Sequence, residues 1–188
     1  MKIQNSKKNE MENLILTLIP RKKIYRLCFK LLKRNDLIWF QYRILQRILG
    51  TKAYLFKINK SQDSYCNFCE ASIETLSHLF VSCPVVSEFW QSLTLHLQLP
   101  GIFLTPEPSS ILFGLIETEF DFFPKNIVIL VAKKYIWMCS REHKSLTLHG
   151  FKKFLKNIYT EENYIAKITN QLSKFEKSWF LLKEISES

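Results

Sequence analysis

Apolar residues recur at intervals of three and four along most of the chain, which is the period of an amphipathic α-helix. The first segment with this pattern, residues 20–34, predicts a helix with one apolar face and one basic face. The basic face carries Lys22, Arg26 and Lys30.

A second amphipathic helix is predicted over residues 36–49. Asn35 or Asp36 suits its N-cap, and Gly50 suits its C-terminal stop. Its predicted apolar stripe consists of Ile38, Tyr42, Leu45 and Leu49, and the aromatic residues Trp39, Phe40 and Tyr42 are expected in the core more often than on a base-stacking surface.

The middle of the chain predicts two further helices and a break. A short helix over residues 74–82 is expected to carry His78, and Pro84 suits the first position of the next helix. The apolar face of that helix is formed by Val86, Trp90, Leu93 and Leu97. The turn-rich stretch 99–110 is the predicted boundary between the middle and the C-terminal part.

Three helices are predicted in the C-terminal part, and no stretch alternates long enough for a sheet. Residues 124–141 have the pattern of a buried helix, with Lys133 and Lys134 on its remaining face, and residues 151–159 form a short helix. Thr160 is the predicted cap of the last helix. Its apolar stripe consists of Ile165, Ile168, Leu172, Phe175, Trp179 and Leu182, and packing within the molecule is favoured over a coiled coil.

The charge of the chain indicates that this helical protein has a polyanionic partner. The net charge is +10, distributed as +12 over residues 1–60, −7 over residues 61–130 and +5 over residues 131–188. Basic segments that flank an acidic centre favour nucleic acid as the partner. The alternative is that these charges are ordinary solvated helix faces.

The cysteine content and the hydropathy of the chain indicate the cellular compartment in which the protein is expected. The chain has 5 Cys, an odd and small number for a disulfide scaffold, and three of them cluster near a histidine. Reduced thiols and the lack of a secretory signal predict a cytoplasmic or nuclear protein. The apolar runs are too short to cross a bilayer, so no membrane association is expected.

The strongest chemical signal is a set of four metal ligands. Cys66, Cys69, His78 and Cys83 follow the spacing C-x2-C-x8-H-x4-C. Zinc prefers four thiolate or imidazole ligands in a tetrahedron, and with all four positions filled by protein the site is structural. One structural Zn²⁺ is therefore predicted, with a folding contribution on the order of 10 kcal/mol. The alternative is that the cysteines are incidental core residues and His78 a surface residue.

Together these patterns predict a mainly α-helical bundle with one irregular Cys-Cys-His-Cys zinc knuckle. We expect a basic helical segment at residues 1–60, a zinc-binding module at 61–99 and a helical tail at 100–188. The remaining cysteines, Cys28 and Cys139, are expected to be buried thiols.

The stretch 41–93 resembles the reverse-transcriptase zinc-binding domain near the C-terminus of LINE-type (non-LTR) retrotransposon polyproteins. The residues that carry the resemblance are Arg43 and Leu45, the Cys66-Asn67-Phe68-Cys69 knuckle, Glu74-Thr75, His78-Leu79-Phe80, Cys83-Pro84 and Phe89-Trp90. Residues 111–115, 126–137 and 164–179 are similar to the helical tail of such elements.

The resemblance implies a module that binds zinc and helps a parent reverse transcriptase to hold its RNA template or target DNA, with RNA the favoured partner. We expect Arg43 and Arg47 to join the basic residues of segment 20–34 in contacting nucleic acid, and Phe68 to add stacking. The chain lacks polymerase and endonuclease motifs, so we expect a truncated copy without catalytic activity.

Two other classes of function stay open at this point. A structural or protein-interaction module would use zinc to hold its helices while the stripe at 165–182 docks the polymerase or another partner. A small enzyme would need a nucleophile with a base or an open metal position, and the sequence provides neither.

Overall fold

A computed structural model describes residues 32–96, 108–114 and 122–183 of the protein. The described part is helical, and its elements are α3 (Asn35–Leu45), α4 (Lys52–Lys57), η1 (His78–Ser82), α5 (Pro84–His96), α6 (Pro108–Phe113), α7 (Phe122–Glu142), α8 (Leu148–Ile168), α9 (Leu172–Trp179) and η2 (Phe180–Leu182). Within these residues the only β-pairing is an isolated bridge between Tyr65 and Ile73. The predicted fold class, a helical bundle with a zinc knuckle, is confirmed.

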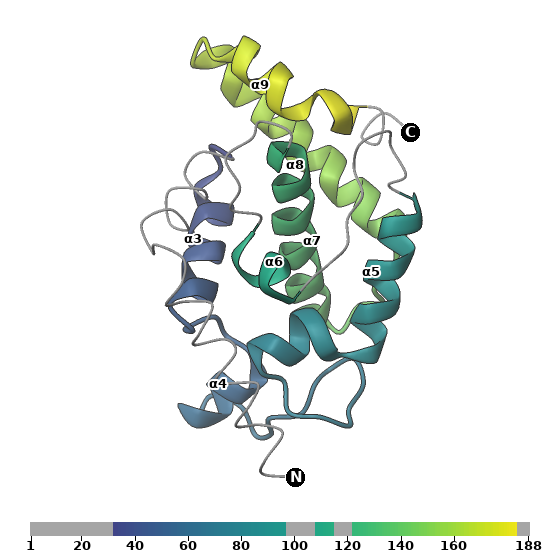
Figure 1. Cartoon of the computed structure of the whole chain (residues 1–188). Coiled ribbons are helices and arrows are strands. Elements are labelled where there is room, and N and C mark those ends of the chain that lie inside the picture. Colours follow the sequence, from purple (N-terminus) through teal and green to yellow (C-terminus); the bar gives the residue numbers. More distant parts are fainter. Residues whose placement is uncertain (1–31, 97–107, 115–121, 184–188) are drawn as a thin grey trace.

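Helix α7 lies at the centre of the fold. It contacts α3, α6, α8 and α9 as well as the short turns η1 and η2 (Figure 1). Residues 127–133 are all buried, so this helix is apolar around most of its circumference, as expected of a helix surrounded by others. None of the described helices is both long and apolar enough to span a membrane.

Lys133 was predicted on a polar face of this helix, and that prediction is wrong. Its side chain is 1% exposed and donates hydrogen bonds from Nζ to Gln41 Oε1 at 2.5 Å and to the Leu112 carbonyl at 3.2 Å. Gln41 also donates from Nε2 to the Leu112 carbonyl at 2.9 Å. These bonds compensate the ammonium group for lost water and join α3, α6 and α7.

Helix α3 begins at Asn35 with Arg34 in the N-cap position, so neither Asn35 nor Asp36 is its N-cap as predicted, and the helix buries a different face. Gln41 turns inward because it bonds to Lys133, and this rotates the buried face away from the predicted stripe. The buried residues are Leu37, Phe40, Gln41 and Ile44. Trp39 was expected in the core and is instead 58% exposed.

The end of α3 also differs from the prediction. The helix ends at Leu45 and not near Gly50: Arg47, two residues later, has a φ of 58°, and the Ile48 N–H bonds to the Arg43 carbonyl at 2.9 Å. This is the hydrogen bond of a Schellman motif, in which the residue with positive φ follows the helix.

The C-terminal part contains one long helix where two were predicted to meet at Thr160. Thr147 caps α8 by accepting a hydrogen bond from the Gly150 N–H at 3.1 Å. Thr160 lies inside α8, and its hydroxyl donates to the Lys156 carbonyl at 3.0 Å, so it caps nothing. The break comes instead at Asn170, whose φ is 53°.

Helix α9 folds back onto α8, and its aromatic residues Phe175 and Trp179 pack within the molecule. The Tyr159 ring lies 5.2 Å from the Phe175 ring and 5.5 Å from the Trp179 ring, centroid to centroid. Ile168, which belongs to the predicted stripe, is 62% exposed at the end of α8. The prediction of internal packing therefore holds for Phe175, Trp179 and Leu182, whereas Leu172 at the start of α9 is 38% exposed.

The structure describes only part of the predicted turn-rich stretch 99–110 and of the predicted helix 20–34. The end of the turn-rich stretch 99–110 overlaps the short helix α6, which buries Ile111, Leu112 and Phe113 against the core. Six residues are too few for a helical period to be recognised, so the sequence did not reveal it. Most of the predicted helix 20–34, with Cys28, and also Leu97, lie outside the described residues.

Candidate metal centre

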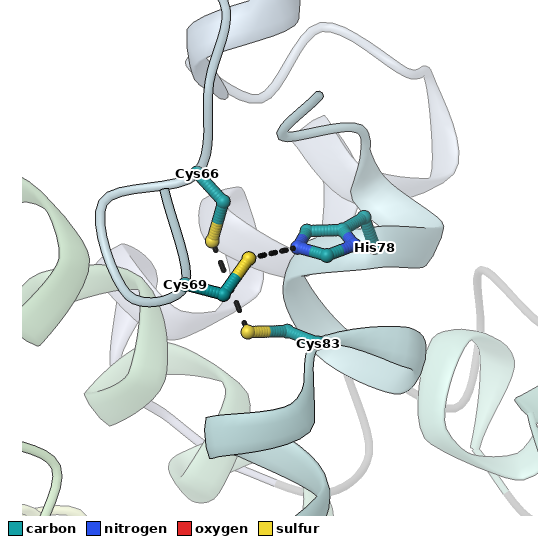
Figure 2. A group of neighbouring side chains, drawn as sticks. All are labelled: Cys66, Cys69, His78 and Cys83. Atoms are coloured by element: carbon teal, nitrogen blue, oxygen red, sulfur yellow. Dashed lines mark hydrogen bonds between the residues drawn. The ribbon is translucent and has the colours of Figure 1, made fainter. Parts of the chain in front are cut away.

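The structure brings the four predicted ligands together at the start of α5. The ligand atoms of Cys66, Cys69, His78 and Cys83 all lie within 4.8 Å of one another. In Figure 2, two of them come from a loop and two from the helical turn that faces it. The Cys66 and Cys83 sulfurs are 3.9 Å apart, and Cys69 Sγ is 3.3 Å from His78 Nε2.

The first two ligands belong to a tight hairpin whose arms meet at the Tyr65–Ile73 bridge. The Cys66 N–H bonds to the Ser72 carbonyl and the Glu70 N–H to the Cys66 carbonyl, at 2.8 and 2.9 Å. The Phe68 N–H lies 3.4 Å from Cys66 Sγ and donates to it. Backbone bonds thus turn both sulfurs of the C-x2-C pair to one side and supply a donor for thiolate charge.

The other two ligands flank a π-helical turn. Thr75 caps the turn, because its hydroxyl oxygen accepts the His78 N–H at 3.0 Å. The Cys83 N–H reaches back to the His78 carbonyl at 2.9 Å, which is the i to i+5 bond of a π-turn. Trp90 in α5 supports the turn by donating from Nε1 to the Phe80 carbonyl at 2.9 Å.

Cys83 also lies directly before α5, whose first residue is Pro84. The Cys83 carbonyl accepts the Ser87 N–H at 2.8 Å, so Cys83 occupies the N-cap position. The backbone N–H of Val86 also hydrogen-bonds to the Cys83 thiol. The positive end of the helix dipole favours a thiolate at this place, as a metal ligand must be.

The contact between the Cys66 and Cys83 thiols shifts the pKa of each in opposite directions. The hydrogen bond from Cys83 lowers the pKa of Cys66 to about 4, against the opposing effect of burial. The same bond and burial raise the pKa of Cys83 above its ordinary 9.0. Both thiols must be thiolates to hold a metal, so zinc binding would release protons from this pair.

The donor set and its size fit zinc. In a tetrahedral site with Zn–S bonds of about 2.3 Å, neighbouring sulfurs lie roughly 3.8 Å apart. The observed 3.9 Å between Cys66 and Cys83 agrees with that spacing. The four residues can hold one zinc ion with no position left for water or substrate, so the metal would stabilise the fold and not activate a reactant.

A buried carboxylate, Glu74, fixes the loop to the rest of the molecule. Its side chain is 0% exposed, and the Lys52 N–H donates to its Oε1 at 2.8 Å. On the other side, the Ser140 hydroxyl donates to Oε2 at 2.9 Å, and the Arg141 guanidinium pairs with Oε1. The Glu74 N–H bonds to the Ser64 carbonyl at 2.8 Å.

Asn67, between the first two ligands, adds a second link to α7. Its side-chain amide donates to the Ser140 carbonyl at 2.7 Å, and its own N–H lies 3.5 Å from Glu74 Oε2. The C-terminal end of α7 therefore holds the knuckle in place. The sequence did not show this role, because Ser140 lies 66 residues from Glu74 along the chain.

The residues predicted to contact nucleic acid lie in three kinds of place. Lys22, Arg26 and Lys30 are outside the described residues. Arg43 and Arg47 are exposed, the first on α3 and the second just after its end. Phe68 is half-buried and packs against the core.

The other histidines and the remaining described cysteine lie outside the metal group. His96, His143 and His149 are exposed, as expected, and Cys139 is a buried free thiol on α7. Burial raises the pKa of the Cys139 thiol, which favours its neutral form.

Comparison with protein families agrees with this geometry. Residues 9–90 match the family described as zinc-binding in reverse transcriptase. The match confirms the resemblance to a reverse-transcriptase zinc-binding domain, and it contains all four candidate ligands. No catalytic domain was found in this comparison. A comparison with curated proteins gave no match.

Proposed function

We propose that this zinc-binding module of reverse-transcriptase-related proteins binds nucleic acid, as the C-terminal part of a non-LTR retrotransposon enzyme, with RNA preferred over DNA. Zinc holds the knuckle, and basic side chains contact phosphates. The module performs no catalysis of its own, since its metal group is closed and buried among core residues. Reduced thiol ligands suit the cytoplasm or the nucleus.

The charge arrangement carries this proposal. In the part of the chain that the structure describes, several carboxylates are turned inward or neutralised: Glu74 and Glu162 are buried, and Asp36 and Asp63 form ion pairs. Arg43 is exposed. The net charge of +10 means that cations remain in excess after such pairing, and these are available to a polyanion.

The test is binding of the zinc-loaded protein to a structured RNA and to duplex DNA, followed by fluorescence anisotropy between about 50 and 200 mM salt. Each phosphate contact releases counterions, so the affinity is expected to fall steeply with salt, and RNA is expected to bind more tightly. Affinity that does not change with salt, or absence of binding to both nucleic acids, would contradict the proposal.

Exposed apolar side chains favour one alternative, a module that docks a protein such as the parent polymerase. Ile168 and Phe180 are 62% and 75% exposed near the two ends of the α8–α9 pair. Such a contact would be apolar and tolerant of salt. Alanine at both positions would then abolish association with the polymerase while leaving RNA binding unchanged.

A further inference from the structure

Helix α8 separates its charges onto two sides. Its two carboxylates both face the start of α3: Glu162 is 3% exposed and accepts the Lys33 and Arg34 N–H groups at 2.9 and 2.8 Å. Glu161 pairs with the Arg34 guanidinium at 2.7 Å. Each carboxylate of this helix is therefore occupied within the molecule.

The opposite side of α8 carries cations without such partners. Lys153, Lys156 and Lys167 are exposed, and none of them forms an ion pair with any residue that the structure describes. At about 100° per residue, these three lysines fall within one third of the helix circumference, on the side away from the buried Phe151. From Lys153 to Lys167 the helix rises roughly 21 Å, a length that several phosphates of one strand would cover.

An aromatic ring lies among these lysines. Tyr164 is 65% exposed and is one turn from Lys167 on the same side of the helix. The other aromatic residues of α8 point away from this side: Phe151 is buried, and Phe154 and Tyr159 pack against the core. An exposed ring beside cations is the arrangement with which proteins stack unpaired bases.

We propose that the lysine-bearing side of α8, defined by Lys153, Lys156, Tyr164 and Lys167, is an RNA-binding surface. The lysines contact consecutive phosphates of a single-stranded segment, and Tyr164 stacks on one of its bases. This inference rests on the proposed function and places a contact surface on a helix outside the zinc-binding match, which ends at residue 90.

The packing of α8 favours RNA over an anionic membrane as the occupant. A basic helix binds a bilayer by inserting its apolar side among the lipids. That side of α8 is already buried against the core through Phe151, Leu155 and Ile158, each 0% exposed. Only the polar side is available, and it offers phosphate contacts and one stacking ring.

The experiment compares two charge-matched double variants of the full chain, Lys153→Gln/Lys156→Gln on α8 and Lys174→Gln/Lys177→Gln on α9. Both remove two exposed lysines three residues apart. Binding to a fluorescent single-stranded RNA is measured across a salt series, and circular dichroism verifies folding. The α8 variant is expected to reduce the slope of log affinity against log salt by about 1.4, and the α9 variant to change it little.

Tyr164 is tested separately. Tyr164→Ala is expected to weaken RNA binding about fivefold or more without changing the salt slope, whereas Tyr164→Phe retains the ring and the affinity. Equal losses in both double variants would mean that only net charge matters and would overturn the inference.

The remaining outcomes separate the two proposals. Wild-type binding to RNA with no effect of the α8 variant overturns this surface and leaves the proposed function intact. Absence of wild-type binding overturns both. If the α8 variant loses binding to phosphatidylserine vesicles but not to RNA, the surface belongs to a membrane and the inference is wrong.

Discussion

The zinc knuckle and the α7–α8–α9 part of the molecule are stabilised by different means. The knuckle, residues 64–83, depends on four candidate metal ligands and on one buried carboxylate, Glu74. The helical part depends on burial of large apolar side chains, including Phe151 and Trp179. The first region is held by a few directional contacts and the second by many small ones, so single changes in the two regions should have different consequences.

The largest effect is expected from removal of one ligand. Cys83→Ser should abolish stoichiometric zinc and with it a contribution on the order of 10 kcal/mol. The measurement is metal content by mass spectrometry, with limited proteolysis to follow opening of residues 64–83. Cys139→Ser is the matched control, because it changes a buried cysteine outside the group. Zinc that remains at one equivalent in Cys83→Ser would contradict the assignment.

A smaller effect is expected in the helical part, where a substitution should lower stability but leave zinc bound. Trp179→Ala removes a ring that is 2% exposed and stacks on Phe175, and should lower the free energy of unfolding by about 4 kcal/mol. Zinc should stay bound at one equivalent. Phe180→Ala, one residue further, is the control, since that ring is 75% exposed. Chemical denaturation and metal content check both variants, and loss of zinc in Trp179→Ala would show that the two regions unfold together.

A change at Glu74, which links the two regions, should have a somewhat smaller effect on stability and also affect zinc binding. Glu74→Gln leaves the Arg141 guanidinium without its carboxylate and should cost about 3 kcal/mol. It should also weaken zinc affinity roughly tenfold, because Asn67 loses its support. Competition with a chromophoric chelator measures that affinity. Asp63→Asn, which removes the more exposed ion pair with Lys52, should leave it unchanged.

The smallest effect concerns pH. Burial raises the pKa of Glu162 above its ordinary 4.5, despite the N–H groups of Lys33 and Arg34 that favour the charged form. A carboxyl with a raised folded pKa stabilises fully below its unfolded pKa and loses that contribution as pH rises through the folded value. Wild-type stability should therefore decline over this window, and Glu162→Gln should flatten the decline in denaturation series at several pH values. An unchanged slope would mean that this carboxyl is not perturbed.

The sequence predicted the metal group better than the helix faces. The four candidate ligands lie within 18 positions, so their local spacing determines which side chains meet. The inward turn of Gln41 depends on Lys133, which is 92 positions away, and no local pattern reports such a contact. The same holds for Glu74 and Ser140.

Helix boundaries were predicted least well, because the residue preferences that indicate helix ends are weak. Thr160 is a good N-cap by residue type, but its hydroxyl can also bond to the carbonyl four residues earlier, as it does here. Arg47 takes the positive φ that follows the end of α3, although a glycine lies three positions later. Residue preferences of this kind are small compared with the packing of α8 and α3 against α7.

The π-turn between His78 and Cys83 bears on how such motifs are recognised in other sequences. In an ordinary α-helix, residues five apart point about 140° away from each other, and such a pair could not share an ion. The wider π-turn contains about one more residue than an α-helical turn, and this brings His78 and Cys83 to the same side. In this chain the spacing of four residues between His78 and Cys83 therefore corresponds to a local insertion in the helix, and a motif search that assumes α-helical spacing would overlook such a ligand pair.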